Sequence, residues 1–331
     1  MYLSKRSNGV YYLYFENKNG SLSSKSTKCR NKTDAIKFLN SFKIEYEEKI
    51  QNRIRLTQFR IDYLKHSEKF HSINTYNYLK YLFNDLVEYF GNIFLDEIDS
   101  NSIRNYLYNK TKVSTYTAQK YLAHLRKAFQ FANDCGNIKL NPLQKFENFK
   151  IPERQPLFLS KQDFKKLCKE IYLKKHFHYL DLVIFATYTG LRASEIINLQ
   201  WNQILIEHKL ILLDNQSSIT KTKKVRAIPL NKKAFAVLKR KDKNSQFVFT
   251  LNGEKLKLDY VSKRFKKFII SSKLNKKYKF HSLRHTFASW LVQKDVPIQK
   301  VSKLLGHSDI KTTQIYAHLR TEDLIKAVNS L

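Results

Sequence analysis

The stretch LLGHSDIKTTQIYAH, residues 304–318, carries a histidine and a tyrosine nine residues apart, His307 and Tyr316. The spacing predicts a helix, a short turn and a second helix that begins near Lys311. In that second helix, the threonines at 312–313 are expected to satisfy backbone donors. The chain has 20 tyrosines, so this tyrosine gains meaning only from the motifs that accompany it.

Two upstream motifs supply arginines and a further histidine. HSLRHTFAS, residues 281–289, contains His281 and Arg284, and TGLRASEI, residues 189–196, contains Arg192. Two arginines can hold the non-bridging oxygens of a phosphate in fork geometry. A histidine can move a proton near neutral pH, and a tyrosine hydroxyl can act as a covalent nucleophile. Together these groups are suited to attack a phosphodiester without a metal ion.

The three motifs resemble the active site of the tyrosine recombinases, the phage integrase and Xer superfamily, and the resemblance covers residues 55–331. It implies that the tyrosine is the nucleophile and that the arginines bind the scissile phosphate. The family also uses a lysine on a β-hairpin, and Lys221 in TKTKKVRAIPL, residues 220–230, stands in that place, with Lys223 and Lys224 as alternatives. The catalytic set implied by the resemblance, which includes no cofactor and no metal, is Arg192, Lys221, His281, Arg284, His307 and Tyr316.

Two side chains next to these motifs are assigned supporting roles. Glu195 lies three residues after Arg192, and we expect it to orient the arginine, because a free carboxylate would repel a phosphate. His281 and His285 have the i, i+4 spacing of zinc-binding helices, but the glutamate of an HExxH motif is absent and Arg284 would oppose a dication. We therefore expect His285 to be a structural donor.

The charge of the chain favours a polyanionic partner. Lysine and arginine total 61 against 28 aspartates and glutamates, a formal net charge of +33. Such an excess adds self-repulsion unless a polyanion binds it. Charge alone does not separate DNA from RNA or from an anionic membrane. The hydrophobic content of 42% excludes a disordered basic tail and indicates a globular protein.

Cysteine usage and hydropathy predict a cytoplasmic protein without membrane contact. The cysteines at positions 29, 135 and 168 are scattered, which indicates neither a zinc site nor a disulfide framework. The N-terminus lacks a secretory apolar region. The longest apolar stretch, around residues 180–190, is shorter than the ~20 residues that a spanning helix needs.

Residues 1–53 predict a small β unit followed by a helix. VYYLYF, residues 10–15, is β-prone, the Asn-Gly pairs at 8–9 and 19–20 are turn signals, and residues 32–49 have a helical apolar face. Some integrases carry a similar arm that contacts DNA away from the crossover site. The resemblance therefore implies an arm-type DNA-binding unit, and a sheet that only packs on the next domain is the alternative.

The rest of the chain predicts two larger domains. Residues 54–150 show apolar residues at helical spacing and correspond to the SAM-like core-binding domain of the family, which binds DNA. Residues 149–156 contain two prolines and no periodicity, which predicts a linker. Residues 151–331 form the predicted catalytic domain, with strands within 204–213 and 225–230 and helices in the remainder. The predicted fold class is thus mainly α, with a small antiparallel β-sheet in an α+β catalytic domain.

The last segment, TEDLIKAVNSL, residues 321–331, predicts a short helix with an apolar stripe. Leu324, Val328 and Leu331 share one face. Because so short a helix is unstable alone, the stripe must bury against the chain's own domain or a neighbouring protomer. The resemblance favours the neighbouring protomer.

The resemblance implies a site-specific recombinase that cuts and rejoins DNA through a 3′-phosphotyrosine intermediate. The 5′-hydroxyl of a second strand reverses the first step, so the reaction needs neither ATP nor a metal. The implied partners are double-stranded DNA with a paired recombination site, a tetramer of the chain on that DNA, and accessory proteins. The implied role is integration and excision of a mobile element, or chromosome dimer resolution. A type IB topoisomerase-like enzyme and a non-catalytic basic DNA-binding protein remain alternatives.

Overall fold

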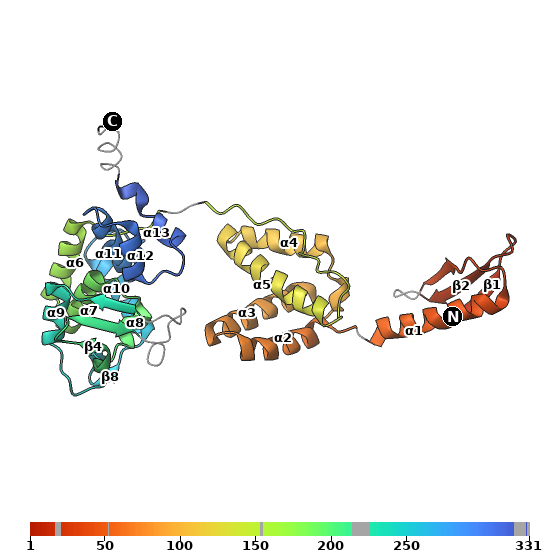
Figure 1. Cartoon of the computed structure of the whole chain (residues 1–331), viewed down its shortest axis with the longest axis horizontal. Coiled ribbons are helices and arrows are strands. Elements are labelled where there is room, and N and C mark those ends of the chain that lie inside the picture. Colours follow the sequence, from red (N-terminus) through yellow and green to blue (C-terminus); the bar gives the residue numbers. More distant parts are fainter. Residues whose placement is uncertain (17–20, 52, 153–154, 214–225, 321–328, 330–331) are drawn as a thin grey trace. The chain divides into compact units, whose positions relative to one another are not determined.

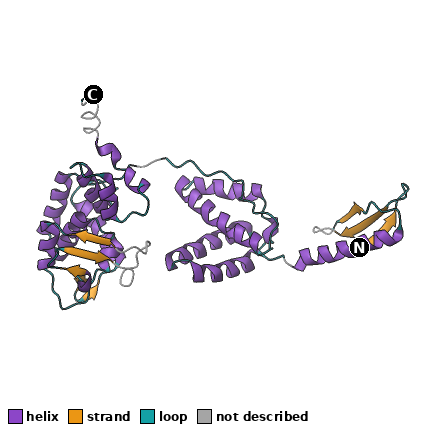
Figure 2. Ribbon diagram, in the orientation of Figure 1, coloured by secondary structure: helices purple, strands orange, loops and turns teal. Residues whose placement is uncertain are grey.

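The computed structural model describes residues 1–331 except 17–20, 52, 153–154, 214–225, 321–328 and 330–331 (Figure 1). The chain divides into two compact units, residues 1–152 and 153–331. Helices dominate both units, and each small sheet is antiparallel (Figure 2). The predicted fold class is confirmed. Within the described ranges, no helix has both the length and the apolar character of a membrane span.

The N-terminal segment is a three-stranded sheet followed by a helix, as predicted. The strands are in sequence order, and the turn at Asn8 and Gly9 joins the first two, with Gly9 at a φ of 79°. The second predicted turn, residues 19–20, lies outside the described residues. Leu13 and Ala35 are fully buried between sheet and helix, and the rings of Phe15 and Phe42 lie 5.0 Å apart. The elements are β1 (Tyr2–Lys5), β2 (Tyr11–Glu16), β3 (Leu22–Ser26) and α1 (Lys32–Gln51).

Residues 54–152 of the first unit contain four α-helices and one short 3-10 helix around a single apolar core. The apolar faces meet in a cluster that fully buries Phe83, Leu122 and Leu125. Local residue types set the helix ends, because Asp99 accepts a hydrogen bond from the N–H of Ser102 and Gly91 follows the last residue of α3 at a positive φ. The elements are α2 (Leu56–Phe70), α3 (Ile73–Phe90), η1 (Leu95–Glu97), α4 (Ser100–Thr111) and α5 (Thr115–Asp134).

In the C-terminal unit the largely buried helix α11 packs against the helices α7 and α12, and the unit also contains a three-stranded sheet. The side chains of Thr286, Ala288 and Ser289 in α11 have no exposed surface. The N–H of Leu159 donates a hydrogen bond to Thr286, which joins the start of the unit to this helix. The helices are α6 (Lys161–Leu173), α7 (Phe177–Thr189), α8 (Ala193–Ile197), η2 (Trp201–Gln203), α9 (Lys232–Lys239), α10 (Leu258–Ser271), α11 (Ser282–Val292), α12 (Ile298–Leu305), α13 (Lys311–Gln314) and η3 (Ala317–Arg320).

The strands of this unit fall within the two predicted stretches, with one addition. β4 (Ile204–Leu205), β5 (Leu210–Leu213) and β6 (Arg226–Pro229) form an antiparallel sheet in that order. The expectation of helices in the remainder was wrong at β7 (Thr250–Leu251) and β8 (Glu254–Lys255), which form a hairpin. Its turn is Asn252-Gly253, with both residues at positive φ, a pair that favours a two-residue hairpin. Apart from Asn329, the predicted C-terminal helix lies outside the described residues.

Candidate active site

Arg284 occupies the first turn of α11 and is almost completely buried. Its guanidinium donates to the carbonyl of Gly190, at 2.7 Å, and to the carbonyl of Leu305, at 2.5 Å. Both carbonyls lie at helix C-terminal ends, where they lack intrahelical partners and carry partial negative charge. Burial, together with the charge of Arg192, lowers the pKa of Arg284 to about 9. The group therefore remains protonated at neutral pH.

Arg192 is placed by a tight turn between α7 and α8. Gly190 ends α7 at a φ of 67°, and a Cβ there would lie 2.3 Å from the ring of Phe287, so the turn requires glycine. Arg192 donates through Nη1 to Glu195 Oε1 at 2.8 Å and through Nη2 to the carbonyl of Gly306 at 3.5 Å. Its side chain is 35% exposed. It can therefore still meet a ligand.

Glu195 is a buried carboxylate that joins two arginines. Its contact with Arg192 is the one predicted, but its second oxygen also accepts from Nη2 of Arg226, at 2.8 Å. Burial opposes the ionised form, yet the charges of Arg226 and Arg192 outweigh it and lower the pKa of Glu195. Sequence reasoning missed Arg226. The signal was its position two residues before the buried Ile228 in β6, because alternate residues of a strand share a face.

His307 follows the end of α12 in the predicted helix–turn–helix arrangement. Gly306 ends α12 in the left-handed conformation, and Nδ1 of His307 lies 2.7 Å from the hydroxyl of Thr313. The expectation that the threonines satisfy backbone donors was wrong for Thr313. Asp309 accepts from the N–H of Lys311 instead. Burial and the surrounding arginines lower the pKa of His307 to about 4.

The hydroxyl of Tyr316 lies 2.6 Å from Nδ1 of His285. The tyrosine is 2% exposed and packs among apolar residues of α11 and α12, and this burial raises its pKa to about 12. Burial and the charges of neighbouring groups lower the pKa of His285 to about 4, so its ring is neutral. The partner of His285 in this contact, the hydroxyl of Tyr316, was not predicted from the sequence. His281 lies edge-on to His285, with ring centroids 4.8 Å apart.

The described part of the site gathers five of the six predicted catalytic residues in one unit. The turn before α8, the start of α11, the end of α12 and the residues after α13 supply them. Lys221, with its alternatives Lys223 and Lys224, lies outside the described residues. The strands on either side of it, β5 and β6, pair in the predicted sheet.

The comparisons with known proteins agree with this geometry. Residues 158–323 match a family model described as "Phage integrase family", and residues 55–151 match one described as "Phage integrase SAM-like domain". The chain is a tyrosine recombinase of the phage integrase family. The family predicted from the motifs is thereby confirmed.

Similar proteins span most of the length of this recombinase. It is 28% identical over 291 residues to a tyrosine recombinase of Pseudothermotoga lettingae, covering 84% of this chain and 98% of the relative. It is 30% identical over 230 residues to tyrosine recombinase XerD of Lacticaseibacillus casei, covering 66% of this chain and 76% of the relative. The relatives are named as recombinases, which supports the predicted enzyme class.

Solved structures show the same fold at lower sequence identity. A lambda integrase dimer bound to a COC′ core site has a TM-score of 0.71 and 19% identity, covering 96% of this chain and 95% of that one. The Tn1549 transposon integrase in complex with transposon right end DNA has a TM-score of 0.70 and 20% identity, covering 82% of this chain and 100% of that one. A lambda integrase tetramer bound to a Holliday junction has a TM-score of 0.68 and 19% identity, covering 93% of this chain and 95% of that one.

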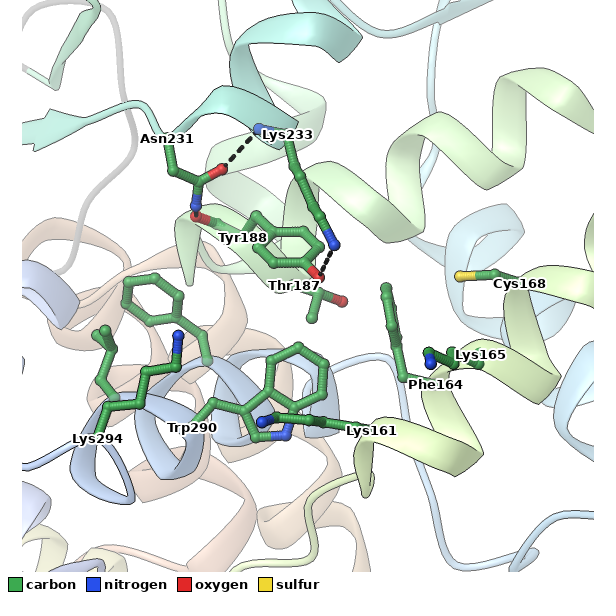
Figure 3. A pocket seen from close by; sticks show the side chains of 12 residues that line it. Lys161, Phe164, Lys165, Cys168, Thr187, Tyr188, Asn231, Lys233, Trp290 and Lys294 are labelled. Carbon is green, nitrogen blue, oxygen red and sulfur yellow. Dashed lines mark hydrogen bonds between the residues drawn. The ribbon is translucent and has the colours of Figure 1, made fainter.

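The recombinase also has a cavity of about 480 Å³ that none of the predicted catalytic residues lines. Its walls come from α6, α7, α9 and α11, and aromatic side chains such as Tyr188 and Trp290 face into it (Figure 3). Lys233 at its edge donates to the hydroxyl of Tyr188 at 2.9 Å. Phe287, which covers Gly190, is part of the lining, so this cavity borders the turn that carries Arg192.

We expect the catalytic unit to lose stability as the pH falls from about 6.5 to about 4. In the unfolded chain His285 and His307 titrate near pH 6.5, whereas the folded site keeps both neutral down to about pH 4. Above pH 6.5 neither state binds the protons and the full stability is present. Between the two values only the unfolded state binds them, so each histidine costs on the order of 2 kcal/mol after solvent screening.

Urea unfolding of the full chain, followed by tryptophan fluorescence at pH 7, 6, 5 and 4.5, measures this loss. Both tryptophans, Trp201 and Trp290, lie in the catalytic unit, so the signal reports that unit alone. His285→Gln and His307→Gln should each flatten the decline. Parallel curves for the variants and the natural chain would contradict the assignment.

Proposed function

We propose that the site of this recombinase cleaves one DNA strand by attack of Tyr316 on the scissile phosphate. The new Tyr–O–P bond forms as the bond to the 5′ oxygen breaks, which leaves a 3′-phosphotyrosine and a 5′-hydroxyl. The observation that carries the proposal is the hydroxyl of Tyr316, held at 2.6 Å from a neutral histidine beside buried arginines. Arg192 and Arg284 would neutralise charge that builds on the non-bridging oxygens, and His307 would donate a hydrogen bond to them.

The pKa values of the free site suggest how the tyrosine proton leaves. A tyrosine with a pKa of about 12 and a histidine with a pKa of about 4 exchange a proton poorly. Positive neighbours contribute to the low pKa of His285, so a phosphate anion bound beside Arg284 offsets part of their effect. Substrate binding would thus raise the basicity of the histidines at the moment when the proton must leave. His281, next to His285, would assist this transfer.

The proposed substrate is double-stranded DNA with a paired recombination site, bound by a tetramer of the chain. The net charge of +33 suits a DNA partner, and the structural neighbours include integrases solved on DNA, one as a tetramer on a Holliday junction. The proposal places the reaction in the cytoplasm, with accessory proteins. The matches to recombinases favour neither of the two alternatives, a topoisomerase-like enzyme or a non-catalytic DNA-binding protein.

In this proposal the chain has three functional parts. Residues 151–331 are the catalytic domain, and residues 54–150 bind the core DNA site, in line with the match to a SAM-like domain. Residues 1–53 form an arm that contacts DNA outside that site. One face of the arm sheet supports this role, because Arg6 stacks over the ring of Tyr12, at 3.9 Å, and donates to the hydroxyl of Tyr14. Such cationic and hydroxyl groups on a sheet suit DNA backbone and base edges.

Tyr316→Phe should abolish the covalent adduct while DNA binding and folding stay unchanged. The substitution removes only the attacking oxygen, and the ring keeps its packing. Denaturing gel electrophoresis of the chain with a DNA library measures the adduct, and gel shift measures binding. An adduct formed by the variant would reject Tyr316 as the nucleophile.

Lys221→Ala should slow cleavage of ordinary DNA by roughly 100-fold, because the leaving 5′ oxygen then lacks its proton donor. A substrate with sulfur at the bridging 5′ position should restore the rate, since a thiolate leaves without a proton. Lys223→Ala and Lys224→Ala are the matched controls. Rescue of one of these controls in place of Lys221→Ala would move the general acid to that position.

Arg6→Ala should shorten the protected DNA footprint at its outer end and leave cleavage at the core site intact. Lys37→Ala, which removes one exposed charge from α1, is the matched control. Footprinting on the site recovered from trapped adducts measures the difference. If both variants keep the full footprint, the arm sheet does not contact DNA through this face.

Residues 321–331 should dock into the cavity of Figure 3 on a neighbouring protomer. The cavity is apolar with Lys161 and Lys165 among its lysines, and the segment carries an apolar stripe after Glu322 and Asp323. Lys161→Glu with Lys165→Glu should therefore abolish cooperative assembly on paired sites by repelling the segment. Adding Glu322→Lys and Asp323→Lys should restore it.

Native gels and ultracentrifugation on paired-site DNA measure this assembly. Lys166→Glu with Lys169→Glu, on the same helix but outside the cavity, is the matched control and should assemble normally. Unchanged assembly in the cavity variant, or failure of the charge swap, would place the segment elsewhere.

A further inference from the structure

We propose that Arg226 is a positioning residue of the reaction, which holds Glu195 and so keeps Arg192 available to the scissile phosphate. The inference rests on the proposed function of the site. It concerns a residue that touches neither the nucleophile nor, by its burial, the DNA.

The three side chains form a chain of charge-assisted hydrogen bonds. Oε1 of Glu195 accepts from Nη1 of Arg192, and Oε2 accepts from Nη2 of Arg226, both at 2.8 Å. The backbone N–H of Arg192 also donates to Oε2, at 2.8 Å. Each carboxylate oxygen is thus bound to a different guanidinium. Arg192 uses Nη1 for this pair, and its Nη2 makes only the long 3.5 Å contact with the carbonyl of Gly306.

Burial separates the roles of the two arginines. The side chains of Glu195 and Arg226 are 4% and 11% exposed, whereas that of Arg192 is 35% exposed. Only Arg192 can therefore reach a phosphate from this trio. The charge of Arg226 compensates that of Glu195, so the net charge that the trio presents to DNA is the single positive charge of Arg192.

Loss of Arg226 would change the partner of Arg192. Both oxygens of Glu195 would then be available to one guanidinium, and carboxylates bind arginine in a two-pronged fork when geometry allows. Such a fork occupies the edge of Arg192 that would otherwise bind the phosphate. The uncompensated carboxylate would in addition repel the DNA.

The fold holds Arg226 in place from a second side. Its Nη1 donates to the carbonyl of Leu305 at the end of α12. The side chain then passes over Gly306, where a Cβ would lie 2.2 Å from Nη1. Gly306 also has a φ of 64°, which favours glycine. The glycine before His307 thus gives Arg226 its space, which explains why a Gly-His pair occurs in this motif.

Cleavage by Arg226→Ala tests the proposal against a purely structural role. The substrate is a synthetic duplex of the site recovered from trapped adducts, and the readout is the rate of covalent adduct formation at saturating protein. We expect a loss of roughly 100-fold or more for the natural substrate. Arg226→Lys should retain more activity, because it keeps the charge that compensates Glu195.

Two further measurements separate positioning from stability. Glu195→Gln in the Arg226→Ala background should raise the rate, because it removes the carboxylate that captures Arg192. A methylphosphonate at the scissile position carries a methyl group in place of one non-bridging oxygen and is uncharged. On this substrate the rate loss caused by Arg226→Ala should be smaller, because less charge needs neutralising in the transition state. Arg240→Ala, which breaks the 2.6 Å ion pair of an exposed arginine with Asp181 in the same unit, is the control and should cleave normally.

Distinct outcomes overturn the inference and the proposed function. If the natural chain forms no adduct, the proposed function fails. If it forms an adduct and Arg226→Ala cleaves equally fast, only the role of Arg226 fails. Equal defects on the phosphate and methylphosphonate substrates, with no gain from Glu195→Gln, would also reject positioning. Gly306→Ala, which displaces the guanidinium without removing it, should show the same substrate dependence.

Discussion

The carbonyl oxygen of Leu305 accepts hydrogen bonds from two buried guanidinium groups, those of Arg226 and Arg284. This oxygen joins strand β6 and helix α11 to the end of helix α12, directly before the turn that carries His307. The last carbonyls of a helix lack intrahelical partners and carry partial negative charge. Buried arginines need such acceptors, because an unpaired buried charge is costly. The C-terminal end of α12 and the two arginines therefore stabilise one another.

The same concentration of charge sets the electrostatics of the whole site. Among the residues that the structure describes, Arg192, Arg226 and Arg284 face one buried carboxylate, Glu195, so this cluster carries excess positive charge before any substrate binds. That excess, together with burial, keeps the histidines neutral. A phosphate would supply the missing negative charge. A site of this kind is preorganised for an anion, because the cost of assembling its cations is met when the protein folds.

Local sequence patterns predicted the helices and strands better than they predicted the contacts between side chains of different elements. Residue type is enough to end a helix at Gly91 and to begin one after Asp99, because capping involves neighbours in sequence. The β7–β8 hairpin was missed because two-residue strands have no periodicity, and only its Asn-Gly turn marks it. Thr313 was expected to serve its own helix, yet it binds His307, because the turn between them brings the two side chains together.

The sequence by itself determined the chemical groups, their motifs, the helices that carry them and the excess of positive charge. Only the tertiary structure decided which groups meet. Tyr316 meets His285 and Glu195 meets Arg226, and each pair is 31 residues apart along the chain. Residue patterns record local backbone preference and the face that an element buries. Contacts between distant side chains depend instead on the packing of α8 and β6 in one apolar cluster and of α12 in another, with α11 contributing to both, and on the burial that makes their charges pair.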